Sequence, residues 1–168
     1  VAVAKASPGQ LNYASVTAGS STHLAAEMFN LMAGVKLVRI NYKGVAPAIN
    51  DIIGGRVQLM FLAAGSVTAH IKSGRLRALG VTTLQPTALF PGMPTIAGSG
   101  VPGYESGVTY GILVPAGTPV AIVRTLNAEI VRIVQRPEVR ERLLGEGSEP
   151  VGSTPEQYGR AMREEIAK

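Results

Sequence analysis

The stretch NYASVTAGSSTHL, residues 12–24, changes character twice and organises the prediction for the rest of the chain. It begins with alternating side chains, with Leu11, Tyr13 and Ser15 on one face, which is the period of a β-strand. Small and hydroxyl residues follow from Val16 to Ser21, and the apolar residues beyond them recur at helical spacing. The sequence therefore predicts a strand, a short loop and a helix in direct succession.

The loop between this strand and helix has the character of an anion-binding site. The first backbone N–H groups of a helix have no partner within it, and the helix dipole adds partial positive charge there. Such a turn favours a carboxylate or a phosphate. Four hydroxyl groups would add further donors: those of Thr17, Ser20, Ser21 and Thr22. The alternative is that Ser20 or Ser21 only caps the helix, and these residues alone leave both interpretations open.

Composition limits the classes of function. The chain has 168 residues, 46% of them hydrophobic and 16% charged, which is enough for a sizeable core. Its net charge of +5 does not come from a basic run, because glutamates interleave with arginines over residues 132–142, where charge is densest. Three Phe, five Tyr and no Trp offer few rings for stacking bases, so nucleic-acid binding is not expected. The absence of cysteine excludes disulfides, thiol catalysis and cysteine metal sites.

The start of the chain has helical character that nothing before it can cap. We interpret Val1–Ala6 as the tail of a helix whose beginning is missing, ended by Ser7-Pro8-Gly9. The same residues lack the charge pattern of a signal peptide. No apolar run in the sequence reaches the length needed to cross a bilayer.

Two further units of strand, small-residue turn and helix follow the first. We expect strands over residues 35–41, 57–62 and 76–82, and helices over residues 45–53 and 67–73. This alternation predicts an α/β fold with a mostly parallel sheet flanked by helices. Ligands of such sheets bind beyond the carboxyl ends of the strands. Those ends are the turns Val16–Ser21, Tyr42–Gly44 and Ala63–Ser66.

The second half of the chain is expected to differ. Residues 84–103 are rich in Pro and Gly and read as a connection with one short helix near Pro94–Ala97. An extended strand is expected over residues 104–114. Three helices are expected after it: one with Thr118 as N-cap, one from Pro137 to Gly145, and one from Pro155 with a capping box formed by Thr154 and Gln157.

Catalytic chemistry has little support in the sequence. The two histidines, His23 and His70, each lie just inside a predicted helix after a small-residue turn. A metal site would also need a carboxylate nearby, and we expect no metal and no cofactor. Ser20 or Ser21 with His23 would make a nucleophile and base, but no nucleophile elbow, P-loop or dinucleotide motif is present. The protein is therefore not expected to be an enzyme.

Blocks along the whole chain resemble one known family. They include GSSTHLAAEMF, NYKGVAPAINDIIGGRVQLMF, HIKSGRLRALGVTT, PGMPTIAGSGVPGYE, GILVPAGTP and PVGSTPEQY. The family is that of the extracytoplasmic solute receptors of tripartite tricarboxylate transporters, also called Bug or TctC-like proteins. The pattern YKG-x-x-PA-x-x-D-x-x-GG, followed later by GSTPE, is the most specific part of the resemblance.

The resemblance implies the fold of type II periplasmic binding proteins, in which two α/β domains close over a ligand. It assigns residues 1–103 to most of the second, ligand-binding domain. Residues 104–168 would be a C-terminal return into the first domain, whose N-terminal part, about a hundred residues in a domain of ordinary size, is absent. The return segment would then expose apolar edges, which a homodimer or repacking would cover.

The resemblance also implies a periplasmic receptor that captures a small carboxylated solute and hands it to the permease subunits in the membrane. The ligand-binding residues that it implies are Val16, Thr17, Ala18, Ser20, Ser21, Thr22, His23, Tyr42, Lys43, Gly44 and Ala63. Many members carry an acid directly after the residue that matches Phe61, where this chain has Leu62. An apolar carboxylate is therefore favoured over an amino acid.

The alternative function is a ligand-sensing effector domain, because some transcription regulators share this bilobed fold. A helix-turn-helix segment would mark such a regulator, and the sequence has none.

Overall fold

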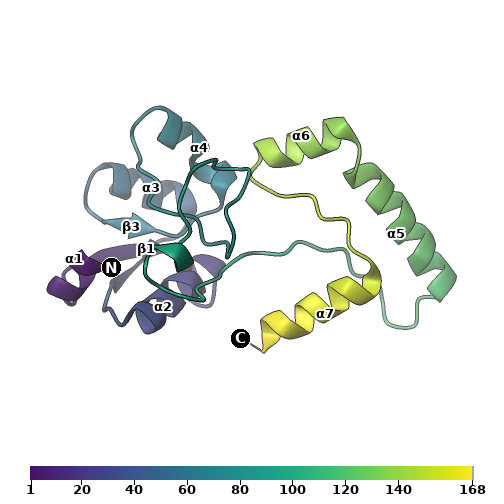
Figure 1. The fold of residues 1–168 in the computed structure, drawn as a ribbon, viewed down its shortest axis with the longest axis horizontal. Coiled ribbons are helices and arrows are strands. Elements are labelled where there is room, and N and C mark those ends of the chain that lie inside the picture. The colour runs from purple at the N-terminus through teal and green to yellow at the C-terminus, as the bar shows by residue number, and fades with distance from the viewer. Residues whose placement is uncertain (168) are drawn as a thin grey trace. The chain divides into compact units, whose positions relative to one another are not determined.

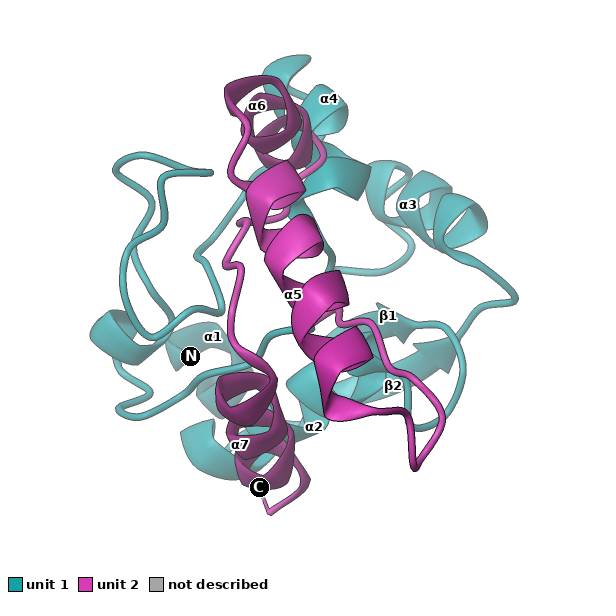
Figure 2. Cartoon of the chain, turned by 90° about the vertical axis from the view of Figure 1, so that its right-hand side faces the viewer, with its two compact units in different colours: residues 1–108 teal, residues 109–168 magenta. Residues whose placement is uncertain are grey.

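The computed structural model describes residues 1–167, which divide after Val108 into two compact units, residues 1–108 and residues 109–167. Figure 2 colours the first unit teal and the second magenta. The first unit contains the sheet, and the second consists of helices and connecting segments. No helix within residues 1–167 is both long enough and apolar enough to cross a membrane.

A parallel three-stranded sheet forms the centre of the first unit (Figure 1). Its strands are β1 (Asn12–Ser15), β2 (Val38–Asn41) and β3 (Leu59–Met60), in the order β2-β1-β3. Since β1 is central, it is covered on both sides, and Tyr13, Ala14 and Ser15 are all buried. Residues 12–15 thus form the middle strand of the sheet, and the predicted α/β fold with a parallel sheet is confirmed.

Helices cover both faces of this sheet. The helices of the first unit are α1 (Ala2–Ala6), α2 (Ser21–Ala33), α3 (Val45–Ile53), α4 (Ala64–Lys72) and the 3-10 helix η1 (Ala97–Ser99). On one face, Tyr13 packs with Ala26 of α2. On the other face, Ala14 packs with Ala48 of α3. The alternation of side chains along β1 thus decides which helix each residue contacts, and the alanines allow both helices to approach closely.

Three aromatic rings pack together beside α2 in the first unit. The ring of Phe29 lies 5.8 Å from that of Phe61 and 6.1 Å from that of Tyr104, the latter edge to face. Tyr104 is completely buried, and its hydroxyl donates to the carbonyl oxygen of Ala25 at 2.9 Å. This cluster holds the loop that contains Val101 against the end of α2.

The second unit has helices but no buried core. Its helices are α5 (Val120–Val134), α6 (Pro137–Gly145) and α7 (Pro155–Ile166). The amide of Asn127 on α5 donates to the carbonyl of Ser153 at 2.9 Å and so fixes the segment before α7. The ring of Tyr158 on α7 lies directly over the backbone of Gly111, where a Cβ would overlap it. None of the residues 109–167 is fully buried.

Three helix predictions are confirmed at residue level. α3 occupies residues 45–53 and α6 runs from Pro137 to Gly145, both as expected. α7 begins with the predicted capping box: Gln157 N–H donates to Thr154 Oγ1 at 3.2 Å, and Thr154 N–H donates to Gln157 Oε1 at 2.9 Å. Val1–Ala6 was expected to be helical, and α1 lies there.

Several predicted strands are shorter or absent. The strand expected over residues 35–41 begins only at Val38, and that over residues 57–62 is reduced to β3, an edge strand paired only with the short β1. The strand expected over residues 76–82 is wrong. Only Val81 pairs there, with Thr95, because neighbouring Pro94 has no N–H to extend the ladder.

The strand expected over residues 104–114 is also wrong. Ser106 N–H donates to the carbonyl of Thr82 at 2.9 Å, but no strand forms beyond that point within the described chain. Tyr110, Ile112 and Leu113 are 82%, 69% and 70% exposed. A β-prone sequence forms a strand only where another strand is available to pair with it.

Some expected helix boundaries were also misplaced. α4 begins at Ala64, three residues earlier than expected, and the short helix near Pro94–Ala97 is displaced to η1. The N-cap of α5 is Pro119, not Thr118, whose hydroxyl donates to the carbonyl of Pro115 at 2.8 Å. Small and polar residues permit several helix starts, so sequence alone fixes these boundaries poorly.

Candidate ligand-binding site

Three helix N-termini follow the carboxyl ends of the three parallel strands. α2 begins after Ser20, α3 after Gly44 and α4 after Ala63. None of these three helices has a side chain capping its N-terminus, and none has an acidic residue in its first turn. The first N–H groups of all three helices therefore remain available to solvent or a ligand. Their dipoles add positive potential along the edge where parallel strands end.

Side chains shape the loop between β1 and α2. The N–H of Val16 donates to Thr22 Oγ1 at 3.4 Å, and Ser20 Oγ lies 3.0 Å from the same oxygen. The N–H of Gly19 donates to Nδ1 of His23 at 3.0 Å. Ser20 is the N-cap residue of α2, yet its hydroxyl does not cap the helix. The simple capping interpretation therefore does not hold for Ser20, and Thr22 and His23 hold the loop instead.

The loop exposes other groups to solvent. Thr17, Ala18 and Ser21 are exposed, while Val16 is partly covered. Neither Thr17 nor Ser21 uses its hydroxyl in a hydrogen bond within residues 1–167. Two hydroxyl donors and the first N–H groups of α2 thus lie together on one short segment.

The turn after β2 contributes differently from the loop after β1. The Tyr42 side chain packs against the Ala14 cluster under α3, and its hydroxyl donates to Asp51 Oδ2 at 2.9 Å. Asp51 also accepts from Arg56 at 2.7 Å. Lys43 is exposed, and Gly44 has an extended backbone at the start of α3. The Tyr42 N–H is also engaged, because it donates to the carbonyl of Ser15 at 2.8 Å, so Tyr42 holds this turn against the end of β1.

Asp51 is expected to make stability depend on pH. Its hydrogen bond to Arg56, and then that to Tyr42, holds the pKa of the Asp51 carboxyl below its ordinary value. A carboxyl with a lowered pKa in the folded state stabilises the fold above its unfolded pKa, about 4, and loses this contribution as pH falls through the folded pKa. Urea unfolding at pH 7 and pH 3 should show a smaller acid-induced loss for Asp51→Asn than for the parent.

Glu141→Gln on α6 is the matched control, because it removes a carboxylate that forms no ion pair with any residue from 1 to 167. This control should retain the parent's full acid sensitivity. Equal pH dependence of the parent and Asp51→Asn would show that the network around Asp51 does not contribute.

The two histidines do not share a site. His23 lies in the first turn of α2, at the strand ends, as expected. His70 lies in the last turn of α4, not near its start, because α4 begins earlier than predicted. A helix after a parallel strand runs back along the sheet, so its last turn lies far from the strand ends. Within residues 1–167, no group of three or more His, Asp or Glu residues could hold a metal ion.

Arg39 on β2 is a residue of this edge that the sequence interpretation missed. Its Nε donates to Ser15 Oγ at 2.6 Å, and its Nη2 donates to the Val16 carbonyl at 3.1 Å and to Asn41 Oδ1 at 2.9 Å. Arg39 stands opposite Tyr13 and Asn41 stands opposite Ser15 in the register of the two strands. The alternation of side chains in VRIN places Arg39 and Asn41 on one face of β2. Only the pairing register of β2 with β1 brings them next to the loop after β1.

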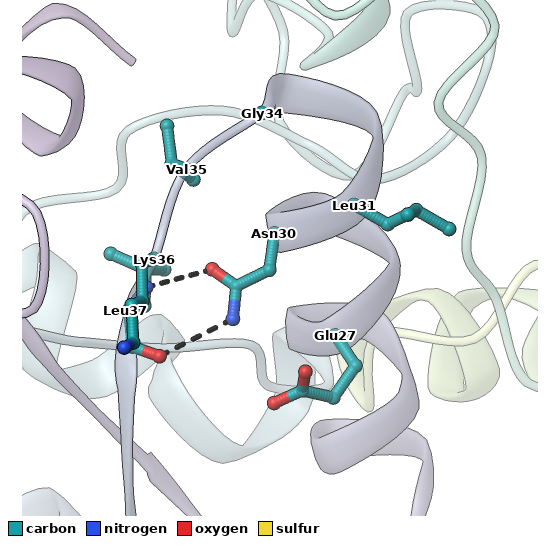
Figure 3. Close-up of a pocket in the computed structure, with 7 residues that line it drawn as sticks. All are labelled: Glu27, Asn30, Leu31, Gly34, Val35, Lys36 and Leu37. Atoms are coloured by element: carbon teal, nitrogen blue, oxygen red, sulfur yellow. Dashed lines mark hydrogen bonds between the residues drawn. The ribbon is translucent and has the colours of Figure 1, made fainter.

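A shallow groove of about 590 Å³ lies elsewhere on the first unit (Figure 3). It is lined by Glu27, Asn30, Leu31, Gly34, Val35, Lys36 and Leu37. The Asn30 amide accepts from the N–H of Leu37 at 2.9 Å and donates to its carbonyl at 3.3 Å. The groove adjoins the C-terminal end of α2, where the helix dipole is negative, and this polarity is unsuited to an anion.

The whole chain, residues 1–168, matches the model of one protein family, the tripartite tricarboxylate transporter family receptor. The chain belongs to this family. The Bug and TctC-like resemblance is thus confirmed, and the members of the family are receptors, not enzymes.

Two relatives show how much of a longer protein the chain covers. A protein from the tcbD-tcbE intergenic region of Pseudomonas sp. strain P51 is 40% identical over 154 residues, which are 91% of this chain and 46% of that protein. Protein BugT of Bordetella pertussis is 34% identical over 168 residues, which are 100% of this chain and 52% of BugT. The chain spans about half the length of these two proteins.

Solved structures of receptors have the same fold. An R. palustris protein solved with adipate is 34% identical, with a TM-score of 0.86 over 99% of this chain and 56% of that one. MatC from Rhodopseudomonas palustris, solved with bound malate, is 26% identical, with a TM-score of 0.79 over 99% and 57% of the two chains. The periplasmic binding protein BugD is 31% identical, with a TM-score of 0.81 over 99% and 56%. The fold is therefore that of a periplasmic binding protein.

Proposed function

We propose that this chain is the ligand-binding part of a periplasmic receptor that captures a small carboxylate-bearing solute for a tripartite transporter. The observation that carries the proposal is the meeting of three uncapped helix N-termini at one edge of a parallel sheet. Adipate and malate, the ligands named for two solved relatives, are both small dicarboxylates, and a site of this polarity suits them.

The charge of the first unit supports the same proposal. It holds eight Lys or Arg residues and three acidic ones, so the whole net charge of +5 belongs to it. The acids are themselves engaged within the fold, since Glu27 accepts from the Tyr13 hydroxyl and Asp51 is paired with Arg56. A positive field raises the local concentration of an anionic solute and speeds its capture.

We assign ligand contacts to three segments at this edge. The loop residues Val16, Thr17 and Ala18, with Ser20, Ser21, Thr22 and His23 at the start of α2, would surround a carboxylate. Thr17 and Ser21 would donate through free hydroxyls, and Thr22 and His23 would hold the loop. Tyr42 would hold the turn after β2. In that turn Gly44 would contribute its backbone and Lys43 its ammonium group, and Ala63 would contribute the start of α4.

The same proposal assigns residues 1–103 to the ligand-binding domain and residues 104–168 to a return segment of another domain. The permease subunits of the transporter would be its membrane partners. The exposed apolar residues Tyr110–Val114 would be covered in that other domain or, in this chain alone, by a second copy of the chain.

The test is a thermal-shift and calorimetric screen against mono-, di- and tricarboxylates, with adipate and malate included. A ligand that binds only the folded state raises the unfolding midpoint. Two proteins should be compared: residues 1–168 alone, and a chimera in which they replace the matching segment of the adipate-bound R. palustris receptor. Binding by the chimera would support the proposal. A folded chimera that binds none of these carboxylates would overturn it.

Loss of a single donor should weaken this binding measurably. Ser21→Ala and Thr17→Val each remove one charge-assisted hydrogen bond, which contributes about 1.5–3 kcal/mol. Ser73→Ala, beyond the far end of α4, is the matched control and should bind like the parent. Unchanged affinity in both Ser21→Ala and Thr17→Val would remove these hydroxyls from the site.

A further inference from the structure

We propose that Arg39 is the positioning residue of the anion site: its guanidinium fixes the loop after β1 and supplies the immobile positive charge beneath it. This inference rests on the carboxylate-receptor function proposed above and names a residue that controls the specificity of that site for charge.

The contacts of Arg39 all lead toward the strand ends. Its register partner on β1 is Tyr13, yet its guanidinium contacts Ser15 and Val16, which lie two and three residues further along. On its own strand it contacts Asn41, again two residues further along. Since the strands are parallel, the guanidinium lies at the carboxyl edge of the sheet, where the loop that carries Thr17 and Ser21 begins.

The guanidinium fork links the ends of β1 and β2 to the loop after β1. One guanidinium joins the buried Ser15 hydroxyl at the end of β1, the carbonyl of Val16 in the loop, and the side chain of Asn41 at the end of β2. A planar guanidinium holds several acceptors in a fixed arrangement, which an ammonium group cannot do. The guanidinium therefore fixes Val16, the first residue of the loop.

Among residues 1–167, no anion is paired with the charge of Arg39. Its three acceptors are neutral oxygens, and the ion pairs among residues 1–167 do not include Arg39. A half-buried cation without an anion is unfavourable. A bound carboxylate at the strand ends would offset this cost, so the arrangement favours an anion over a neutral ligand of the same shape.

The guanidinium also retains donors for such an anion. A guanidinium carries five N–H donors. The hydrogen bonds described use Nε and Nη2, and within residues 1–167 the Nη1 group has no partner. Nη1 can donate to a ligand oxygen directly or through a water molecule.

The test compares Arg39→Gln, Arg39→Lys and the control Lys36→Gln, with adipate and malate as the probes. It uses calorimetry on the chain and on the chimera defined above. Lys36→Gln removes the same charge from the same unit, but Lys36 lies two residues before β2, at the opposite end of the sheet. We expect Arg39→Gln to weaken binding at least about tenfold, Arg39→Lys to weaken it less, and Lys36→Gln to leave it within about twofold.

Two readouts separate this role from general stability. Added salt should weaken binding by the parent more than binding by Arg39→Gln. Salt screens the attraction between the Arg39 charge and the ligand carboxylate, and the variant lacks this attraction. In the ligand-free chain, amide hydrogen exchange over residues 16–20 should be faster in Arg39→Gln than in the parent.

The outcomes are distinct. If the parent proteins bind neither probe nor any other carboxylate, the receptor function itself fails. If they bind, and Arg39→Gln binds equally well or Lys36→Gln loses as much affinity, Arg39 has no special role. If Arg39→Gln loses affinity but retains the parent's salt dependence, the residue acts through folding alone and the proposal is overturned.

Discussion

A Ser20→Asp variant is expected to be more stable than the parent and to lose carboxylate binding. Ser20 already has the extended backbone of an N-cap residue, with φ −66° and ψ 159°, but its hydroxyl bonds to Thr22 and not to the helix. An aspartate there can accept from the free N–H groups of α2, which stabilises a fold by about 0.5–2 kcal/mol. The new charge also interacts favourably with the helix dipole.

The same aspartate would occupy the place proposed for the ligand carboxylate. It would satisfy the donors that the ligand needs, and its negative charge would repel the ligand at close range. Losing two charge-assisted hydrogen bonds alone corresponds to about 3–6 kcal/mol, so binding should fall below detection. Urea unfolding and calorimetry with adipate on the same protein measure the two opposite effects.

Arg136→Asp is the matched control for this experiment. Arg136 is the N-cap of α6 in the second unit, and α6 also lacks a side-chain cap. The change should stabilise that helix and leave carboxylate binding unchanged. Undiminished binding by Ser20→Asp would show that the ligand does not use the N-terminus of α2.

Tyr104→Ala is expected to cause the largest loss of stability in the first unit. The ring is completely buried and contacts Phe29 and Phe61 at centroid distances of 6.1 and 6.3 Å. Truncation of a buried aromatic residue to alanine costs about 3–5 kcal/mol, while a whole domain is stable by about 5–15 kcal/mol. Urea unfolding followed by circular dichroism should show a midpoint far below that of the parent.

Tyr104→Phe separates the ring from its hydroxyl. It keeps the aromatic contacts and removes only the hydrogen bond to Ala25, so it should cost about 0.5–1.5 kcal/mol. Tyr110→Ala is the exposed control, since Tyr110 is 82% exposed, and should change stability little. A similar loss in all three variants would show that the aromatic cluster does not determine the stability of the first unit.

Local chemistry explains which elements could be predicted from the sequence. The strand, loop and helix around Ser15 and Ser21 follow from the change in hydrophobic periodicity along residues 12–24. The ends of α3 follow from Gly44 and Gly54, because glycine is unfavourable inside a helix. The capping box of Thr154 acts within four residues of chain. Each of these features depends on neighbours in the sequence, so the sequence contains the needed information.

The failed predictions depend on residues far away in the chain. The strand expected over residues 76–82 needed a partner, and Pro94 limits its pairing to one residue. Arg39 was missed for a related reason, because its contact with Ser15 spans 24 positions in the sequence. Pairing and register set both outcomes, and periodicity along one segment does not reveal them.

The unpaired segment Tyr110–Val114 also affects how long the chain would survive among proteases. A protease binds its substrate as an extended strand, and this segment is apolar, exposed and outside any helix or strand, so it is not held in another regular structure. Cleavage there would not have to wait for unfolding, so it would occur at a rate independent of the stability of the first unit. The lifetime of the chain in the cell would then be set by how quickly another polypeptide covers these five residues.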